Sequence, residues 1–143
     1  MGLTHVTLTV KPSRDHPESI EVKFLVDSGA VYSLVPGEQL KKLELKAHRS
    51  VKFVLADGTE IERQVGDAYF EYQGQGSAGP VIFGEAGNEP LLGALTLESL
   101  GLVLNPFSRE LQPMRLMLAH ASARGERFTQ ALADERSHLL AAD

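Results

Sequence analysis

An apolar strand that runs into a carboxylate is the feature that most constrains this chain. The run Phe24–Val26 is wholly apolar and is followed at once by Asp27-Ser28-Gly29. A strand without polar positions is expected to be buried on both faces, so Asp27 stands where a covered strand opens into a tight turn. Gly29 supplies backbone freedom there, and Ala30 is too small to obstruct a ligand that approaches the turn.

The Asp-Ser-Gly motif occurs once in the 143 residues. A chain of this length is enough for one domain with a substantial core and is too short for two complete lobes. If Asp27 works as one member of a carboxylate pair, the second member is therefore expected to come from a second molecule.

Short strand-like runs separated by turn residues fill the chain as far as residue 118. Alternating or continuous apolar residues over such short stretches are typical of half-buried or fully buried strands. The expected strands are Val6–Val10, Ile20–Val26, Val51–Leu55, Ile61–Val65, Ala68–Tyr72, Pro80–Phe83, Leu102–Pro106 (which leads into a turn) and Glu110–Leu118. Leu34–Pro36 is a further short apolar run.

Turns and helices complete this pattern. Asp57-Gly58 lies between two strand-like runs and is a strong signal for a β-hairpin, whereas the Gly-rich residues 74–79 are expected to form a flexible connection. Helical runs are few: Thr96–Leu100 predicts a short helix, and Gly37–Leu43 predicts one or two helical turns. The predicted fold class is therefore mostly β, a small closed and mostly antiparallel barrel with one short helix.

The character of the chain changes at about Ala119. From there to Asp143 the residues Ala, Arg, Glu, Leu and Gln prevail, with Phe128, Leu132 and Leu139 at roughly helical spacing. We therefore expect one domain over residues 1–118 and a helical or partly disordered C-terminal tail over residues 119–143.

Composition and charge exclude several classes of function. The net charge is −5 with acidic and basic residues interspersed, and 6% of the residues are aromatic, so neither nucleic acid nor an anionic membrane is an expected partner. No apolar run approaches membrane-spanning length, and residues 1–5 show no secretory signal. Cysteine is absent, which excludes disulfides and thiolate chemistry and fits a cytoplasmic location.

Metal and serine chemistry are also not expected. The five histidines are scattered without metal-ligand spacing, so neither a metal nor another cofactor is predicted. Ser28 and Ser33 lack the G-x-S-x-G context of a serine nucleophile. By itself, Asp27-Ser28-Gly29 fits either a simple turn between strands or an active-site turn.

Three segments in the same order resemble the retropepsin-like aspartic proteases, in particular the bacterial single-domain type. The first is Phe24–Ala30, followed by Leu34–Pro36. The second is Leu55–Thr59, at the place of the family's flap hairpin. The third is Pro90–Glu98, continuing to Gly101–Pro106, and the likeness as a whole runs from about residue 4 to residue 118.

The resemblance implies roles for the residues of the first segment. Asp27 would be the catalytic carboxylate, and the Ser28 hydroxyl would lock two active-site turns together across a dimer. Gly29 and Ala30 would complete the turn, with Gly29 allowing the substrate to approach the backbone closely. Val31 departs from the family, because many relatives have a small polar residue there, and this bears on specificity.

The other two segments would cover and support the site. Ala56, Asp57 and Gly58 would lie at or near the flap tip and help to bind the substrate, whereas Leu92 and Gly93 would pack behind the active-site turn. The implied function is an aspartic endopeptidase, in which two Asp27 carboxylates of a homodimer activate water to cleave an extended peptide. The alternative is a non-catalytic dimerisation or peptide-binding module on the same fold.

Overall fold

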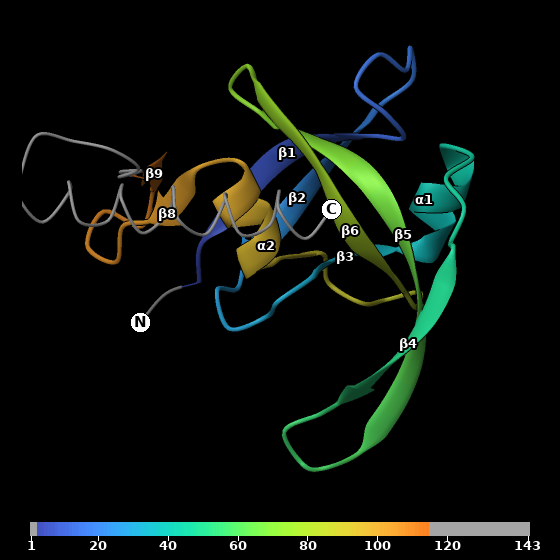
Figure 1. The fold of residues 1–143 in the computed structure, drawn as a ribbon. Coiled ribbons are helices and arrows are strands. Elements are labelled where there is room, and N and C mark those ends of the chain that lie inside the picture. Colours follow the sequence, from blue (N-terminus) through green and yellow to red (C-terminus); the bar gives the residue numbers. More distant parts are fainter. Residues whose placement is uncertain (1–2, 115–143) are drawn as a thin grey trace, which may run out of the picture.

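Seven strands form one sheet that closes on itself (Figure 1). The computed structural model describes residues 3–114. The strands follow the order β1-β2-β7-β3-β6-β5-β4, and β1 also pairs with β5, so the strands from β1 to β5 in this order make a closed ring. The elements are β1 (His5–Lys11), β2 (Ile20–Val26), β3 (Ser33–Pro36), α1 (Gly37–Lys42), β4 (Arg49–Val54), β5 (Glu60–Tyr72), β6 (Gln75–Gly84), β7 (Leu91–Leu92), α2 (Ala94–Ser99), β8 (Leu102–Leu104) and β9 (Leu111–Pro113).

The predicted mostly β, closed barrel is confirmed. Most neighbouring strands pair antiparallel, and the exceptions are β2 with β7 and β3 with β6, which are parallel. The antiparallel pair of β7 and β3 lies between the two parallel pairs. At β7 the chain returns to β2, the strand that ends just before Asp27. The segment with Leu91 and Leu92 is thereby inserted between β2 and β3.

The core fills the inside of this ring. Along β1 the residues Leu8 and Val10 are buried and alternate with more exposed threonines, as the period of a strand requires. Phe24 of β2 is fully buried and meets Phe70 of β5 at a ring-centroid distance of 6.3 Å. Burying aromatic rings of this size contributes strongly to the stability of a small barrel.

The prediction of two separate strands over Ile61–Val65 and Ala68–Tyr72 is wrong, because β5 runs continuously from Glu60 to Tyr72. Gly66 does not interrupt it. A side chain at Gly66 would stand 2.8 Å from the Lys46 carbonyl oxygen, so the glycine allows close packing rather than a turn.

The prediction of a flexible connection over residues 74–79 is also wrong. Strand β6 begins at Gln75, and the stretch Gly76–Gly79 pairs with β5. The turn is confined to Gln73 and Gly74, which both have positive φ angles, of 48° and 81°. Gly76 lies against the ring and hydroxyl of Tyr69, where a side chain would collide.

The described residues 3–114 contain two short helices, one more than the predicted fold class has. The run Gly37–Leu43, expected to make one or two helical turns, forms α1, and α2 begins before the predicted Thr96. Among residues 3–114, no helix is long and apolar enough to span a membrane.

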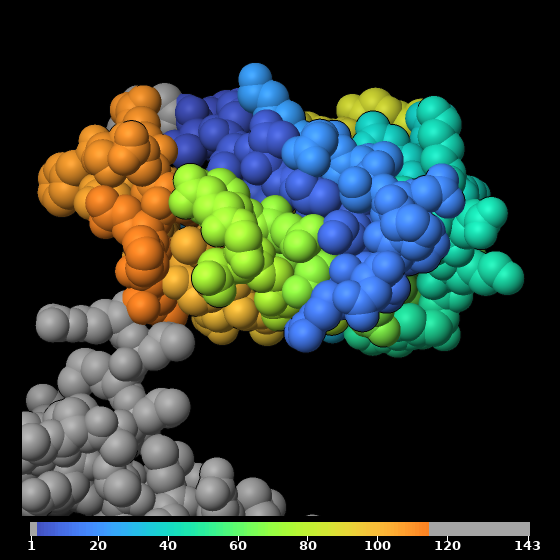
Figure 2. Space-filling model, turned by 90° about the horizontal axis from the view of Figure 1, so that it is seen from above, coloured from blue at the N-terminus to red at the C-terminus, as the bar shows by residue number. Residues whose placement is uncertain are grey.

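A separate two-stranded sheet of β8 and β9 ends the described part of the chain. Figure 2 shows this hairpin, in orange, at the opposite end of the molecule from the cyan segment that contains α1. Glu110–Leu118 was predicted as a strand, and the structure has Leu111–Pro113 within it. The predicted tail over residues 119–143 lies outside the described residues.

Candidate active site

Asp27 lies at the end of β2, where its backbone and side chain are both held. Its N–H donates to the Leu92 carbonyl at 3.0 Å, and its own carbonyl accepts from Ala30 N–H at 3.1 Å. Its carboxylate Oδ1 accepts from Gly29 N–H at 3.0 Å, and the side chain is half-buried. The turn thus fixes the orientation of the carboxylate.

The start of helix α2 holds the loop that follows Asp27. Ala94 N–H donates to the Ala30 carbonyl at 2.7 Å, and Leu95 N–H donates to the Val31 carbonyl at 3.0 Å. The first N–H groups of a helix have no partner within the helix, and here the active-site loop supplies their acceptors. Two backbone hydrogen bonds therefore join the start of α2 to this loop.

Gly93 makes this close approach possible. A side chain there would stand 2.6 Å from the carbonyl carbon and oxygen of Tyr32 and 2.9 Å from the Val31 carbonyl oxygen. Because these atoms belong to the backbone, no small side-chain movement would relieve the collision. Gly93 and its neighbour Leu92 therefore both contact the segment Asp27–Tyr32, and their expected role in supporting a catalytic site stays a prediction.

A buried pair of hydroxyl groups completes the connection, and sequence reasoning missed it. Ser33 Oγ accepts from Gly93 N–H at 2.9 Å and lies 2.6 Å from Thr96 Oγ1. The exposed fractions of Ser33 and Thr96 are 0% and 4%, so water cannot replace these bonds. The available signal was a hydroxyl residue within each of two apolar runs, because a polar group buried there needs a partner.

The hairpin of β4 and β5 extends beyond the rest of the sheet (Figure 1). Its tip is closed by Leu55 N–H donating to the Thr59 carbonyl at 2.7 Å and Gly58 N–H donating to the Leu55 carbonyl at 2.9 Å. Gly58 has a φ angle of 87°, which glycine adopts readily. The Asp-Gly signal for a hairpin is therefore confirmed, with Ala56, Asp57 and Gly58 exposed at the tip.

Asp57 stabilises the tip through its side chain. Its Oδ1 accepts from Thr59 N–H at 2.9 Å. Hydrogen bonds from the Thr59 side chain and backbone hold the pKa of the Asp57 carboxyl below its usual value. The ionised carboxylate is the better acceptor, so the tip is expected to be most ordered when Asp57 is charged.

An apolar cavity of about 500 Å³ lies between the hairpin and the barrel. The barrel side is supplied by β3, β6, β7 and the loop before β7, and the hairpin side by both of its strands. The lining residues are Leu34, Phe53, Leu55, Ile61, Arg63, Ile82, Asn88, Glu89 and Leu91. One of these residues, Leu91, adjoins Leu92, whose carbonyl accepts the Asp27 N–H.

The residues that line this cavity differ from those expected to bind substrate. Ala56, Asp57 and Gly58 are not among them, whereas Phe53 and Leu55 from the same hairpin are. Side chains alternate across a strand, so the cavity wall comes from the faces of β4 and β5 rather than from the tip. Within residues 3–114, no group of three or more histidine, aspartate or glutamate residues is placed to hold a metal ion.

Solved structures share this arrangement of strands. An EIAV protease solved with an inhibitor matches with a TM-score of 0.53 and 14% identity, over 70% of this chain and 89% of the other. The retroviral protease-like domain of Ddi1 from Leishmania major matches with a TM-score of 0.52 and 16% identity, over 81% and 91%. The fold is that of the retropepsin-like aspartic proteases.

A retropepsin-like aspartic protease from Rickettsia conorii is matched with a TM-score of 0.39 and 22% identity, over 71% of this chain and 84% of that protein. No protein-family model matches the sequence, and neither does any curated protein. The resemblance to retropepsins thus stands at the level of the fold.

Replacing Ser33 by alanine is expected to destabilise the fold by about 1–3 kcal/mol, because Gly93 N–H loses its buried acceptor and Thr96 loses its partner. Urea unfolding of the variant and of the wild type measures the difference. Ser50→Ala, at an exposed position of β4, is the control and should change the free energy of unfolding by less than about 0.5 kcal/mol. Equal effects of the two substitutions would contradict the role of Ser33.

The Asp57 carboxyl should titrate below the usual value for aspartate, about 3.9. Because its pKa is lowered in the folded tip, its contribution to order is present above the usual value and is lost as pH falls through the lowered one. Carbon-detected NMR of the carboxyl gives the midpoint directly. Thr59→Val should raise that midpoint, and an unchanged midpoint in this variant would show that the Thr59 hydroxyl is not the cause.

Proposed function

We propose that this chain is an aspartic endopeptidase that hydrolyses peptide bonds as a homodimer. The observation that carries the proposal is the Asp27 carboxylate, which is oriented by Gly29 N–H on a turn fastened to α2. A general base must be held in one orientation by rigid surroundings, and this turn meets that requirement. The retropepsin fold supports the same chemistry.

The second carboxylate is proposed to come from a second copy of the chain. Asp-Ser-Gly occurs once in the sequence, and a two-fold axis beside Asp27 would bring two identical turns together. Ser28 is exposed next to Asp27, where its hydroxyl is available to the turn of the partner. Each chain would thus contribute half of one site.

The proposed reaction needs only these two groups and a water molecule. Two carboxylates in contact cannot both ionise easily, so the pair keeps one proton over a broad pH range. The ionised member takes a proton from the water that attacks the peptide carbonyl, while the protonated member polarises the carbonyl oxygen. Neither a covalent intermediate nor a cofactor takes part in this mechanism.

The substrate is proposed to be an extended peptide held between the barrel and the hairpin. Leu34, Leu91 and Phe53 give the cavity an apolar wall that suits a large apolar side chain. The hairpin would cover the peptide and exclude water from the site, as a flap does. A cytoplasmic location is proposed with it, on the absence of cysteine.

Asp27→Asn is expected to lower the cleavage rate of a denatured protein substrate about a hundredfold to ten-thousandfold, because an amide fits the turn but cannot act as the base. Asp67→Asn is the matched control, since Asp67 is an exposed aspartate on β5, and it should keep full activity. Circular dichroism checks that both variants fold. Full activity of Asp27→Asn would exclude Asp27 as the catalytic base, whereas no cleavage by the wild type would favour the peptide-binding module.

The dimer should weaken as pH rises. The paired carboxylates retain a proton that two separate chains release, so the association constant should fall about tenfold per pH unit through the window where that proton is lost, beginning near pH 4. Asp27→Asn should remove this dependence, while Asp67→Asn should keep it. Sedimentation from acid to neutral pH measures both, and the same pH dependence in all three proteins would mean that the carboxylates do not meet.

A further inference from the structure

Three side chains join the active-site loop to the first strand of the hairpin. Tyr32 comes from the loop, and Arg49 and Phe53 come from β4. Arg49 Nη2 donates to the Tyr32 hydroxyl at 3.2 Å, with its guanidinium carbon 5.9 Å from the centre of the Tyr32 ring. The Phe53 ring meets the Tyr32 ring edge to face, at a centroid distance of 6.1 Å and an angle of 81°.

Tyr32 is the fixed member of this cluster. Its backbone carbonyl packs against Gly93, and the residues on either side are bonded to α2: Val31 through its carbonyl and Ser33 through its hydroxyl. The tyrosine ring therefore projects from the same rigid connection that holds Asp27. Any group that binds this ring is positioned relative to the candidate catalytic carboxylate.

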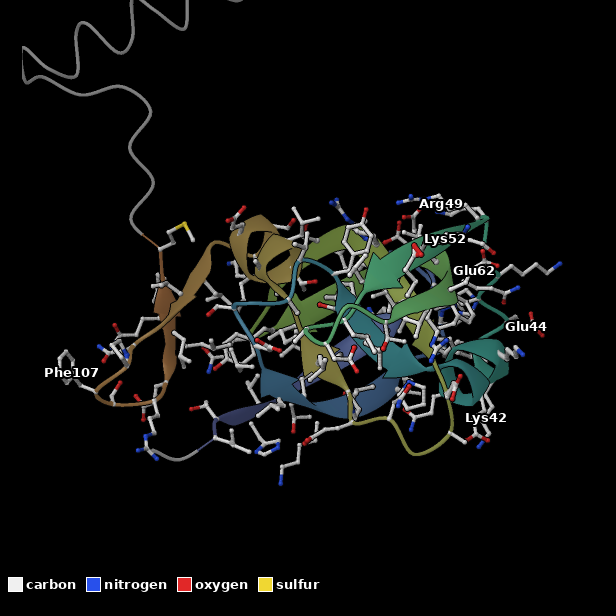
Figure 3. The ribbon with its side chains drawn as sticks, turned by 90° about the horizontal axis from the view of Figure 1, so that it is seen from below. Lys42, Glu44, Arg49, Lys52, Glu62 and Phe107 are labelled. Atoms are coloured by element: carbon white, nitrogen blue, oxygen red, sulfur yellow. The ribbon has the colours of Figure 1, made fainter. Side chains whose placement is uncertain are left out.

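Strand β4 is the movable member. Its sheet pairing is with β5, and most of its residues are half-buried or exposed, so few packing contacts hold it. Among residues 3–114, no carboxylate lies within salt-bridge distance of Arg49, and its hydrogen-bonded partner is the Tyr32 hydroxyl. Figure 3 shows Arg49 at the edge of the molecule, on the same side as Lys52 and Glu62.

Phe53 connects the cluster to the cavity. The Phe53 ring packs against the Tyr32 ring, and Phe53 also forms part of the cavity wall together with Leu34 and Leu91. A shift of β4 away from Tyr32 would carry Phe53 with it and widen the cavity. The contact with Tyr32 thus determines the position of Phe53, and with it the width of the cavity.

We infer that Tyr32 is a positioning residue that sets the place of the β4–β5 hairpin over Asp27 through its contacts with Arg49 and Phe53. Its consequence for peptide cleavage rests on the proposed function, whereas its consequence for the hairpin does not. Losing the hydroxyl alone should loosen the hairpin and weaken substrate binding, because a peptide must then order a segment that the wild-type chain already holds in place.

The first experiment measures the hairpin without any substrate. Hydrogen exchange over Val51–Val65 should be about fivefold faster in Tyr32→Phe than in the wild type, as the loss of one hydrogen bond implies. Arg49→Ala should show a similar effect, and combining both substitutions should add little, because they remove the same bond. Unchanged exchange in Tyr32→Phe would overturn the inference.

A second pair of residues provides matched controls. Arg14 lies over the Tyr69 ring at 5.7 Å, a cation–π contact like that of Arg49 with Tyr32, in the half of β5 that lies beyond Val51–Val65. Arg14→Ala and Tyr69→Phe should leave exchange over Val51–Val65 as in the wild type, whatever their effect on global unfolding. Acceleration by these controls equal to that of Tyr32→Phe would mean a general loss of stability and would also overturn the inference.

The second experiment tests the consequence for cleavage. For a peptide with a large apolar side chain, Tyr32→Phe should raise KM about fivefold with kcat unchanged, because the hydroxyl acts on the hairpin and not on the reacting atoms. A fall in kcat at constant KM would contradict a positioning role. If the wild type itself cleaves no peptide, the proposed function fails, while hydrogen exchange still decides whether Tyr32 positions the hairpin.

Discussion

The backbone connection between the start of α2 and the loop after β2 is the constraint on which the site depends. Ala94 and Leu95 donate to carbonyls of that loop, and Gly93 donates to the buried hydroxyl of Ser33. A helix start always presents unpaired N–H groups, and a loop between strands always presents unpaired carbonyls. Here the N–H groups at the start of the helix and the carbonyls of the loop bond to one another, and these bonds hold the candidate catalytic turn against α2.

The hairpin of β4 and β5, in contrast, is held by few interactions with the rest of the chain. Strand β4 has pairing on one edge, an exposed tip and a short list of side-chain contacts at its base. The molecule therefore combines a carboxylate held by backbone hydrogen bonds with a hairpin whose position rests on weak and separable interactions. Enzymes that enclose a substrate need such a division, because the reacting group must not move while the cover must.

Local patterns predicted the strands and the hairpin turn well, and long-range packing explains what they missed. Asp57-Gly58 determines its own turn through a positive φ and a side-chain bond, so the sequence alone was enough. The sequence predicted two strands where β5 is continuous, because the packing of Gly66 against the Lys46 carbonyl exists only in the fold. Asp27 was recognised through a motif. The Ser33–Thr96 contact joins residues 63 positions apart, and the hydroxyl within each apolar run does not reveal its distant partner.

Strand β5 belongs to two structures at once. Its first half, from Glu60 to Val65, pairs with β4 in the hairpin, and its second half, as far as Tyr72, pairs with β6 and β1 in the barrel. No loop separates the halves, so a displacement of the hairpin has to bend a continuous strand near Gly66, where the chain is packed against Lys46. Any displacement of the hairpin would therefore be shared along β5 and resisted by the sheet, instead of being absorbed by a hinge loop.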